Sequence, residues 1–114
     1  MRAVIALLML ATAASAQQVE CPQRLPGIEA PKARLTGGGM YAGAEKQYEL
    51  IGDRVKVPGG YDVQYGFGVN EIRWLICAYD EKYIWWRRMD LKTTDCRLRE
   101  RKSAGGVIVE LTCK

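Results

Sequence analysis

Short runs of β-branched and aromatic residues, separated by small polar clusters, make up the second half of this chain. The runs span residues 63–67, 72–79, 83–91, 96–102 and 107–113. The clusters between them are rich in turn-forming residues, as in Asp80-Glu81-Lys82. Strands of this length joined by short turns are typical of sequential hairpins. The pattern therefore predicts a mainly β fold, either a small antiparallel meander sheet or a partial barrel.

The first half of the chain is punctuated by proline and glycine. Residues 17–40 contain three prolines and end in a triple glycine, so we expect an irregular N-terminal arm. Residues 41–50 fit a short helix or a strand, although Gly43 disfavours the helix. A short strand at 54–57 is followed by a proline-glycine turn. This division predicts one antiparallel β domain over residues 41–114.

The last two predicted strands determine their own register. If residues 103–106 form a four-residue loop, the strands oppose Cys96 to Cys113, Leu98 to Leu111 and Arg99 to Glu110. This register gives an apolar face, an opposite-charge pair and two cysteines within reach of a disulfide, and a slip by one residue loses all three. We therefore predict the disulfide Cys96–Cys113, which leaves Cys21–Cys77 as the second.

The chain begins with the pattern of a secretory signal peptide. A basic start precedes an apolar run over residues 3–14, and Ala14-Ser15-Ala16 has the small residues of a cleavage site. Cleavage after Ala16 leaves 98 of the 114 residues with a net charge of +3, because the leader contains one arginine and no acid. All four cysteines follow the cut, so we expect a secreted or periplasmic bacterial protein with two disulfides. No membrane anchor is expected.

The composition gives little support to catalysis. The chain contains no histidine, which removes the commonest general base and metal ligand. The cysteines are scattered singly, so neither a zinc site nor a redox C-x-x-C motif is expected. The carboxylates Asp80-Glu81 and Asp90/Asp95 fall in turns or at strand ends, where acidic residues are ordinary. We therefore expect a non-enzymatic protein with no metal or other cofactor.

The segment 83–88 combines aromatic and basic residues. Side chains alternate along a strand, so Trp85 and Trp86 point to opposite faces, each with an arginine two positions further on. Only one face can pack on a small core, which leaves one tryptophan partly exposed. Tryptophan, tyrosine and arginine dominate binding interfaces. We therefore predict a binding surface formed by Tyr83, Trp85, Trp86, Arg87 and Arg88, and extended by Tyr65 and Phe67.

A structural role competes with this interpretation. Small β domains often cover their second face with aromatic residues whose rims are wet, so Trp85 and Trp86 also fit as packing residues. Trp74 is expected in the core, because Ile72 and Ile76 flank it at a period of two. The sequence alone leaves open whether the tryptophan-arginine segment is core or surface.

A second basic feature consists of Arg97, Arg99 and Arg101, which alternation places on one face of a predicted strand. Such a stripe allows nucleic-acid binding. Export and the small net charge argue against that partner, and Glu110 faces Arg99 in the predicted register. We expect a secreted or periplasmic protein as the partner instead.

Three short elements resemble those of known proteins. They are Cys21-Pro22, the run Trp74-Leu75-Ile76-Cys77-Ala78-Tyr79 with its W-x-x-C-x-Y core, and Cys96-Arg97-Leu98. With these, the chain is similar to a group of small secreted proteins of Gram-negative bacteria whose function is uncharacterised. The resemblance implies a periplasmic, disulfide-bonded, β-rich protein and brings no catalytic residues. A looser analogy with periplasmic lysozyme inhibitors rests on size, export and fold class, because this chain lacks the Ser-Gly-Ala-Arg-Tyr segment expected there.

Elimination and the aromatic-basic segment together favour an exported binding module that inhibits or neutralises a wall-active enzyme or a toxin. Two alternatives stay open. One is a structural or stress-related envelope protein without a high-affinity ligand. The other is a carboxylate-dependent hydrolase that uses Asp80 or Glu81.

Overall fold

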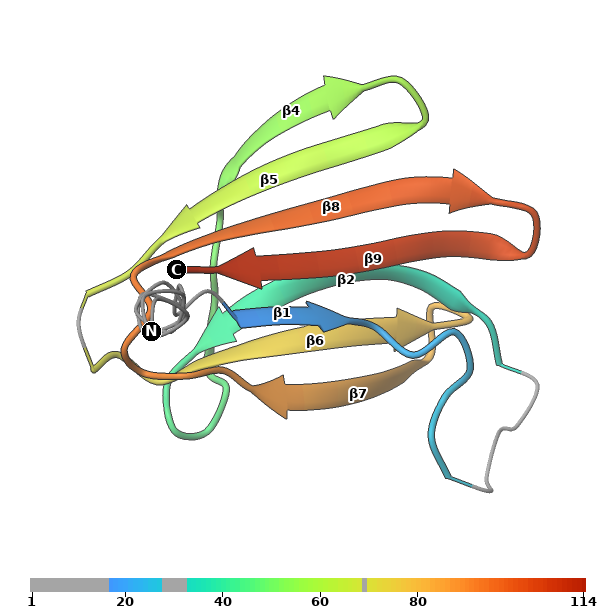
Figure 1. The fold of residues 1–114 in the computed structure, drawn as a ribbon. Helices are drawn as coiled ribbons and strands as arrows, with labels where there is room; N and C mark the ends of the chain where they lie inside the picture. Colours follow the sequence, from blue (N-terminus) through green and yellow to red (C-terminus); the bar gives the residue numbers. More distant parts are fainter. Residues whose placement is uncertain (1–16, 28–32, 69) are drawn as a thin grey trace, which may run out of the picture.

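The polypeptide forms two antiparallel β-sheets that pack face to face (Figure 1). The computed structural model describes residues 17–27, 33–68 and 70–114, so the predicted signal peptide lies outside the described residues. The strands are β1 (Gln17–Glu20), β2 (Leu35–Ala42), β3 (Tyr48–Glu49), β4 (Asp53–Val57), β5 (Gly60–Gly66), β6 (Arg73–Tyr79), β7 (Tyr83–Arg88), β8 (Asp95–Ser103) and β9 (Gly106–Cys113). The predicted class, mainly β and antiparallel, is confirmed. In the described ranges, no helix is long and apolar enough to span a membrane.

The strands are shared between the two sheets rather than arranged in one meander. The five-stranded sheet has the order β1-β9-β8-β5-β4, and the four-stranded sheet has the order β3-β2-β6-β7. Each hairpin stays within one sheet, but β5 pairs with β8 and β2 pairs with β6. A sheet with one apolar face needs a second layer to cover that face, and the division into two sheets provides it.

The expected irregular arm at residues 17–40 contains one complete strand and most of another. β1 pairs with β9 at the edge of the five-stranded sheet, and β2 pairs with β6 in the other sheet. The triple glycine lies inside β2, and the two sheets come close at its middle residue: a Cβ on Gly38 would lie 2.8 Å from Val109 Cγ1 of the other sheet and 3.1 Å from the Ile76 carbonyl oxygen of the neighbouring strand. For residues 41–50 the strand alternative is right, since they contain the end of β2 and all of β3.

The core lies between the inner faces of the sheets. Its buried side chains include Leu35 and Met40 of β2, Leu75 and Tyr79 of β6, Leu98 of β8, and Val109 and Leu111 of β9. Trp74 is not among them, so the prediction that it is a core residue is wrong. The period of two was correct, but the buried face of β6 is the one that carries Leu75 and Cys77, and Trp74 points outward with Ile76.

The β8–β9 hairpin has the predicted register. Cys96 opposes Cys113, Leu98 opposes Leu111 and Arg99 opposes Glu110. The loop is shorter than expected, because Ser103 pairs with Gly106 and leaves two residues between them. Both predicted disulfides, Cys96–Cys113 and Cys21–Cys77, are formed. Two disulfides indicate an oxidising, extracytoplasmic compartment.

Two contacts tie the four-stranded sheet to the segment that follows β1 of the other sheet. The disulfide between Cys21 and Cys77 joins this segment to β6, with the two Cα atoms 5.8 Å apart. The hydroxyl of Tyr79, also on β6, donates a hydrogen bond to the Pro22 carbonyl oxygen at 2.6 Å. Burial raises the pKa of Tyr79 to about 12, so the hydroxyl keeps its proton at neutral pH.

A buried arginine makes a further link at the start of β6. Arg73 has no exposed surface, and its guanidinium donates hydrogen bonds to the carbonyl oxygens of Glu71 (2.8 Å), Gly68 (2.9 Å) and Thr93. The guanidinium carbon lies 4.5 Å from the ring centroid of Phe67. Burial lowers the pKa of Arg73 and nearby carboxylates raise it, and a guanidinium stays charged in proteins. Arg73 therefore holds both the β5–β6 and the β7–β8 loops, which cross between the sheets.

Candidate binding surface

Aromatic and aliphatic side chains gather on the outer face of the four-stranded sheet, opposite the core. The strand registers place Tyr41 beside Trp74 and Ile76 beside Trp86. Directly opposed residues of antiparallel strands point to the same face, so these side chains lie together with Ile84, which is two residues before Trp86. Each is only partly buried, and Ile84 is 49% exposed. We call Tyr41, Trp74, Ile76, Ile84 and Trp86 the aromatic surface.

Specific contacts hold the rings of the aromatic surface in place. The ring centroids of Tyr41 and Trp86 are 5.3 Å apart, and the ring planes meet at 81° in an edge-to-face arrangement. The indole Nε1 of Trp74 donates a hydrogen bond to the Gly43 carbonyl oxygen at 2.8 Å. The ammonium of Lys46 lies 4.3 Å from the ring centroid of Trp74 and 5.2 Å from that of Trp86, within cation–π range. The rings thus form an ordered cluster, and the ammonium of Lys46 beside them adds one positive charge.

The turn after β2 positions this lysine. Gly43 has a φ of 101°, a conformation that residues with a Cβ rarely adopt, and its carbonyl oxygen accepts the backbone N–H of Lys46 at 3.1 Å. The side-chain oxygen of Gln47 accepts the backbone N–H of Glu45 at 2.9 Å. These bonds order the turn, so the lysine side chain is presented to the indole rings.

Strand β7 carries most of the predicted binding residues and lies at the edge of its sheet. Its side chains alternate as predicted. Trp86 and Arg88 are on the outer face, whereas Tyr83 and Trp85 oppose fully buried residues of β6 and pack against the core. Arg87 shares the inner face but is exposed. The structure therefore divides the predicted segment between two faces, and only Trp86 and Arg88 lie on the side of the aromatic surface.

The two outlying predicted residues, Tyr65 and Phe67, lie elsewhere. Tyr65 belongs to β5 in the other sheet, faces the core and is 7% exposed. Burial raises the pKa of Tyr65, with a smaller contribution from Glu49. Phe67 packs against the core and against the guanidinium of Arg73. They do not reach the aromatic surface, because β5 pairs with β8 and not with β7.

Sequence reasoning missed four aromatic-surface residues, Tyr41, Trp74, Ile76 and Ile84, and the neighbouring Lys46. Tyr41 and Lys46 reach the site only because β2 pairs with β6, and no local pattern predicts that distant pairing. A signal did exist for Trp74. Cys77 was predicted to form a disulfide, which places it on the core face, and alternation then puts Trp74 on the opposite face.

The carboxylates considered for hydrolysis lie in turns or next to them. Asp80 and Glu81 form the turn between β6 and β7, where the Asp80 carboxylate accepts the backbone N–H of Arg34 at 3.0 Å. The Asp90 carboxylate accepts a backbone N–H two residues further on at 2.8 Å, and Asp95 begins β8. Among the residues that the structure describes, no three His, Cys, Asp or Glu side chains are grouped so that they could hold a metal ion.

The residues of the aromatic surface determine what it can do chemically. Its rings and aliphatic side chains can bury apolar groups of a partner, and the ammonium of Lys46 can attract a carboxylate at the margin. These groups recognise shape and charge. No protein-family model matches this chain, and no curated protein or solved structure is detectably similar to it.

Proposed function

We propose that this chain is an exported, non-enzymatic envelope protein whose aromatic surface binds another secreted or periplasmic protein. By this binding it inhibits or neutralises a wall-active enzyme or a toxin. The observation that carries the proposal is the ordered ring cluster of Tyr41, Trp74 and Trp86, which lies on the face turned away from the core.

The form of this cluster favours binding over packing alone. Side chains that are ordered before association lose little conformational entropy when a partner arrives. Tyrosine and tryptophan have few rotatable bonds and a large contact area, which makes them effective anchors. Lys46 and Arg88 border the rings, so the partner we expect has an apolar patch edged by carboxylates.

The exported location is part of the proposal. The two disulfides support an oxidising compartment. The finer assignment is a bacterial periplasmic or secreted protein whose signal peptide is removed after Ala16, and it rests on the leader pattern. The resemblance to small secreted proteins of Gram-negative bacteria agrees with this location.

A pair of matched variants tests the proposal. Ile84 and Ile108 are exposed isoleucines on the outer faces of different sheets, 49% and 40% exposed. Ile84→Glu puts a carboxylate into the aromatic surface, and Ile108→Glu makes the same change on the other sheet. We expect wild-type protein to capture a stoichiometric partner from envelope extract, and Ile84→Glu to weaken binding of the purified partner by roughly tenfold or more, as for an interface anchor.

Ile108→Glu is expected to bind as well as wild type. Thermal unfolding of both variants shows whether the substitutions leave the fold intact. Equal weakening by the two variants, or none by Ile84→Glu, contradicts the aromatic surface as the binding site. A wild-type protein that captures no stoichiometric partner contradicts the proposed function itself and supports a structural envelope role.

A further inference from the structure

The outer face of the five-stranded sheet contains a hollow of about 370 Å³. Its lining residues come from β5, β8, β9 and the residue after β9, and they are Gln64, Asp95, Arg97, Arg99, Thr112 and Lys114. We call this site the basic hollow, because it has three basic side chains and one acidic one. Its volume is at the lower end of the range for sites that hold small ligands.

Uncharged hydrogen-bond donors lie on both sides of Arg97 in the basic hollow. Arg97 is opposed by Gln64 on one neighbouring strand and by Thr112 on the other. Arg99 is the next outward-facing residue of β8, and both arginines are exposed. An amide and a hydroxyl each provide a neutral donor, and each guanidinium provides a fork of N–H groups. Donors from three adjacent strands thus line the same space.

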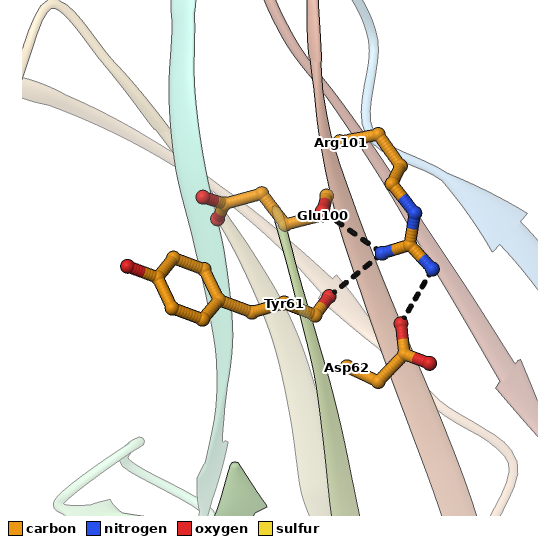
Figure 2. Close-up of polar contacts among 4 residues, drawn as sticks. All are labelled: Tyr61, Asp62, Glu100 and Arg101. Carbon is orange, nitrogen blue, oxygen red and sulfur yellow. Dashed lines mark hydrogen bonds and ion pairs between the residues drawn. The ribbon is translucent and has the colours of Figure 1, made fainter. Parts of the chain in front are cut away.

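The acidic residues nearest to Arg99 are engaged elsewhere. Its cross-strand neighbours are Asp62 and Glu110. The Asp62 carboxylate pairs instead with Arg101 at 2.8 Å (Figure 2), and the Glu110 carboxylate accepts a hydrogen bond from the Gln18 side chain at 2.7 Å. Within the described ranges, Arg101–Asp62 is the only ion pair closer than 4.0 Å. The opposite-charge pair predicted for Arg99 and Glu110 therefore has the right register but forms no ion pair.

Arg101 differs from the two arginines of the basic hollow. Its guanidinium donates hydrogen bonds to the carbonyl oxygens of Tyr61 and Glu100, both at 3.0 Å, in addition to its ion pair with Asp62. Figure 2 shows the ring of Tyr61 and the carboxylate of Glu100 pointing away from this network. The protein itself thus satisfies Arg101, whereas Arg97 and Arg99 line the hollow.

We infer that the basic hollow binds the phosphoryl group of a phosphorylated saccharide or lipid headgroup. A phosphomonoester carries nearly two negative charges and several acceptor oxygens, so it can pair with both Arg97 and Arg99, and the guanidinium fork matches this geometry. Lys114 adds a third basic side chain. Asp95, whose carboxylate accepts a hydrogen bond from the Thr94 hydroxyl at 3.1 Å, is the one acidic residue of the lining. This inference concerns the opposite face from the aromatic surface and is independent of the proposed function.

Titration with glucose 1-phosphate, followed by NMR of the full exported protein, tests the inference. We expect saturable shifts at Gln64, Thr112 and the two arginine side chains. The double variant Arg97→Gln/Arg99→Gln should weaken binding by roughly tenfold or more, since it removes both guanidinium groups and their charge from the hollow. The matched control is Lys56→Gln/Lys102→Gln, which removes the same charge at exposed positions outside the hollow.

The control is expected to change the affinity by less than about twofold at moderate salt. Vesicles of phosphatidylcholine with and without phosphatidic acid separate the two sources: binding to the sugar phosphate alone indicates a soluble saccharide, and stronger binding to phosphatidic acid indicates a lipid. Equal weakening by both double variants, or shifts that map outside the hollow, overturns the inference. Tighter binding of a single-stranded oligonucleotide at equal phosphate concentration also overturns it, in favour of a polymer.

Discussion

The outer faces of the two sheets have the same strand arrangement but different side-chain chemistry. Each presents alternate residues of three adjacent strands. In the aromatic surface, rings from β2, β6 and β7 contact one another or share Lys46. In the basic hollow, the charged groups line an open space instead. Recognition is therefore expected to be apolar and short-ranged on one face, and electrostatic and salt-sensitive on the other.

Arginine shows the same contrast within one residue type. Arg73 is buried and bound by backbone carbonyl oxygens, and Arg101 is bound by a carboxylate and two carbonyl oxygens. Arg97 lies between the uncharged Gln64 and Thr112, and the carboxylates opposite Arg99, those of Asp62 and Glu110, are bound to Arg101 and Gln18 instead. The surroundings of each arginine, more than its residue type, decide whether it supports the fold or remains available to a ligand.

The largest expected effect concerns whether the two faces belong to one folding unit. The disulfide Cys21–Cys77 ties the sheet with the aromatic surface to the other sheet and closes a loop of sequence separation 56, whereas Cys96–Cys113 lies within one sheet with a separation of 17. Serine at both positions of the first pair should lower the free energy of unfolding by about 4 kcal/mol, and at both positions of the second by about 3 kcal/mol.

Urea unfolding, followed by tryptophan fluorescence and by circular dichroism, measures these losses. The two probes should give one coincident transition for wild type, since both faces rest on one core. A larger loss from the in-sheet pair than from the cross-sheet pair contradicts the prediction. Separate transitions for the two probes show that the faces unfold independently.

A smaller loss is expected from the buried arginine that joins the loops between the sheets. Arg73→Met keeps an apolar contact with Phe67 but leaves the carbonyl oxygens of Glu71, Gly68 and Thr93 without their donor. Each unsatisfied buried acceptor costs about 1–3 kcal/mol, and partial hydration reduces the sum, so we expect a loss of about 2–3 kcal/mol.

Arg88→Met is the matched control for Arg73→Met, because Arg88 is exposed on the neighbouring strand. It should change the free energy of unfolding by less than about 0.5 kcal/mol. Equal losses from the two variants would show that Arg73 does not join the sheets. Hydrogen exchange adds a local measurement, since Arg73→Met should raise the exchange rates of backbone amides in the β5–β6 and β7–β8 loops before those of the strands.

Local patterns predicted the parts of the fold that depend on neighbouring strands. The β8–β9 register followed from one hairpin, because its cysteines, leucines and charges agree on a single alignment. Alternation also predicted correctly which β7 residues share a face. The two-residue loop was not distinguished from a four-residue one, since both give the same register when Ser103 pairs with Gly106.

The parts that depend on distant pairing were not predicted. The glycines at 37–39 suggested irregular backbone, yet they lie in β2, where Gly38 lets the sheets approach each other. The aromatic surface needs the β2–β6 pairing, and the basic hollow needs β5 beside β8. The burial of Arg73 was not predicted either: alternation along β6 places it on the same face as Leu75 and Cys77, but arginine is seldom fully buried.

The smallest expected effect is confined to the hairpin that carries the tryptophan-arginine segment. Asp80 and Glu81 have φ values of 52° and 55°, and the backbone N–H of Lys82 bonds to the Tyr79 carbonyl oxygen at 2.9 Å, so the turn resembles type I′. A left-handed residue with a Cβ costs roughly 1–2 kcal/mol, and glycine loses about 0.5–1 kcal/mol more entropy on folding. Glu81→Gly should therefore raise the free energy of unfolding by about 0.5–1 kcal/mol.

Glu81→Ala is the control that separates strain from charge in this turn. It removes the same carboxylate but keeps the Cβ, so it should give no gain in stability. In both variants the backbone N–H at position 81 can still donate to the Thr36 hydroxyl, as it does at 3.3 Å in the wild type. A gain in both variants would assign the effect to charge. A gain only in Glu81→Gly would assign the effect to relief of backbone strain. Neither variant should change glucose 1-phosphate binding, because this turn joins strands of the other sheet from the basic hollow.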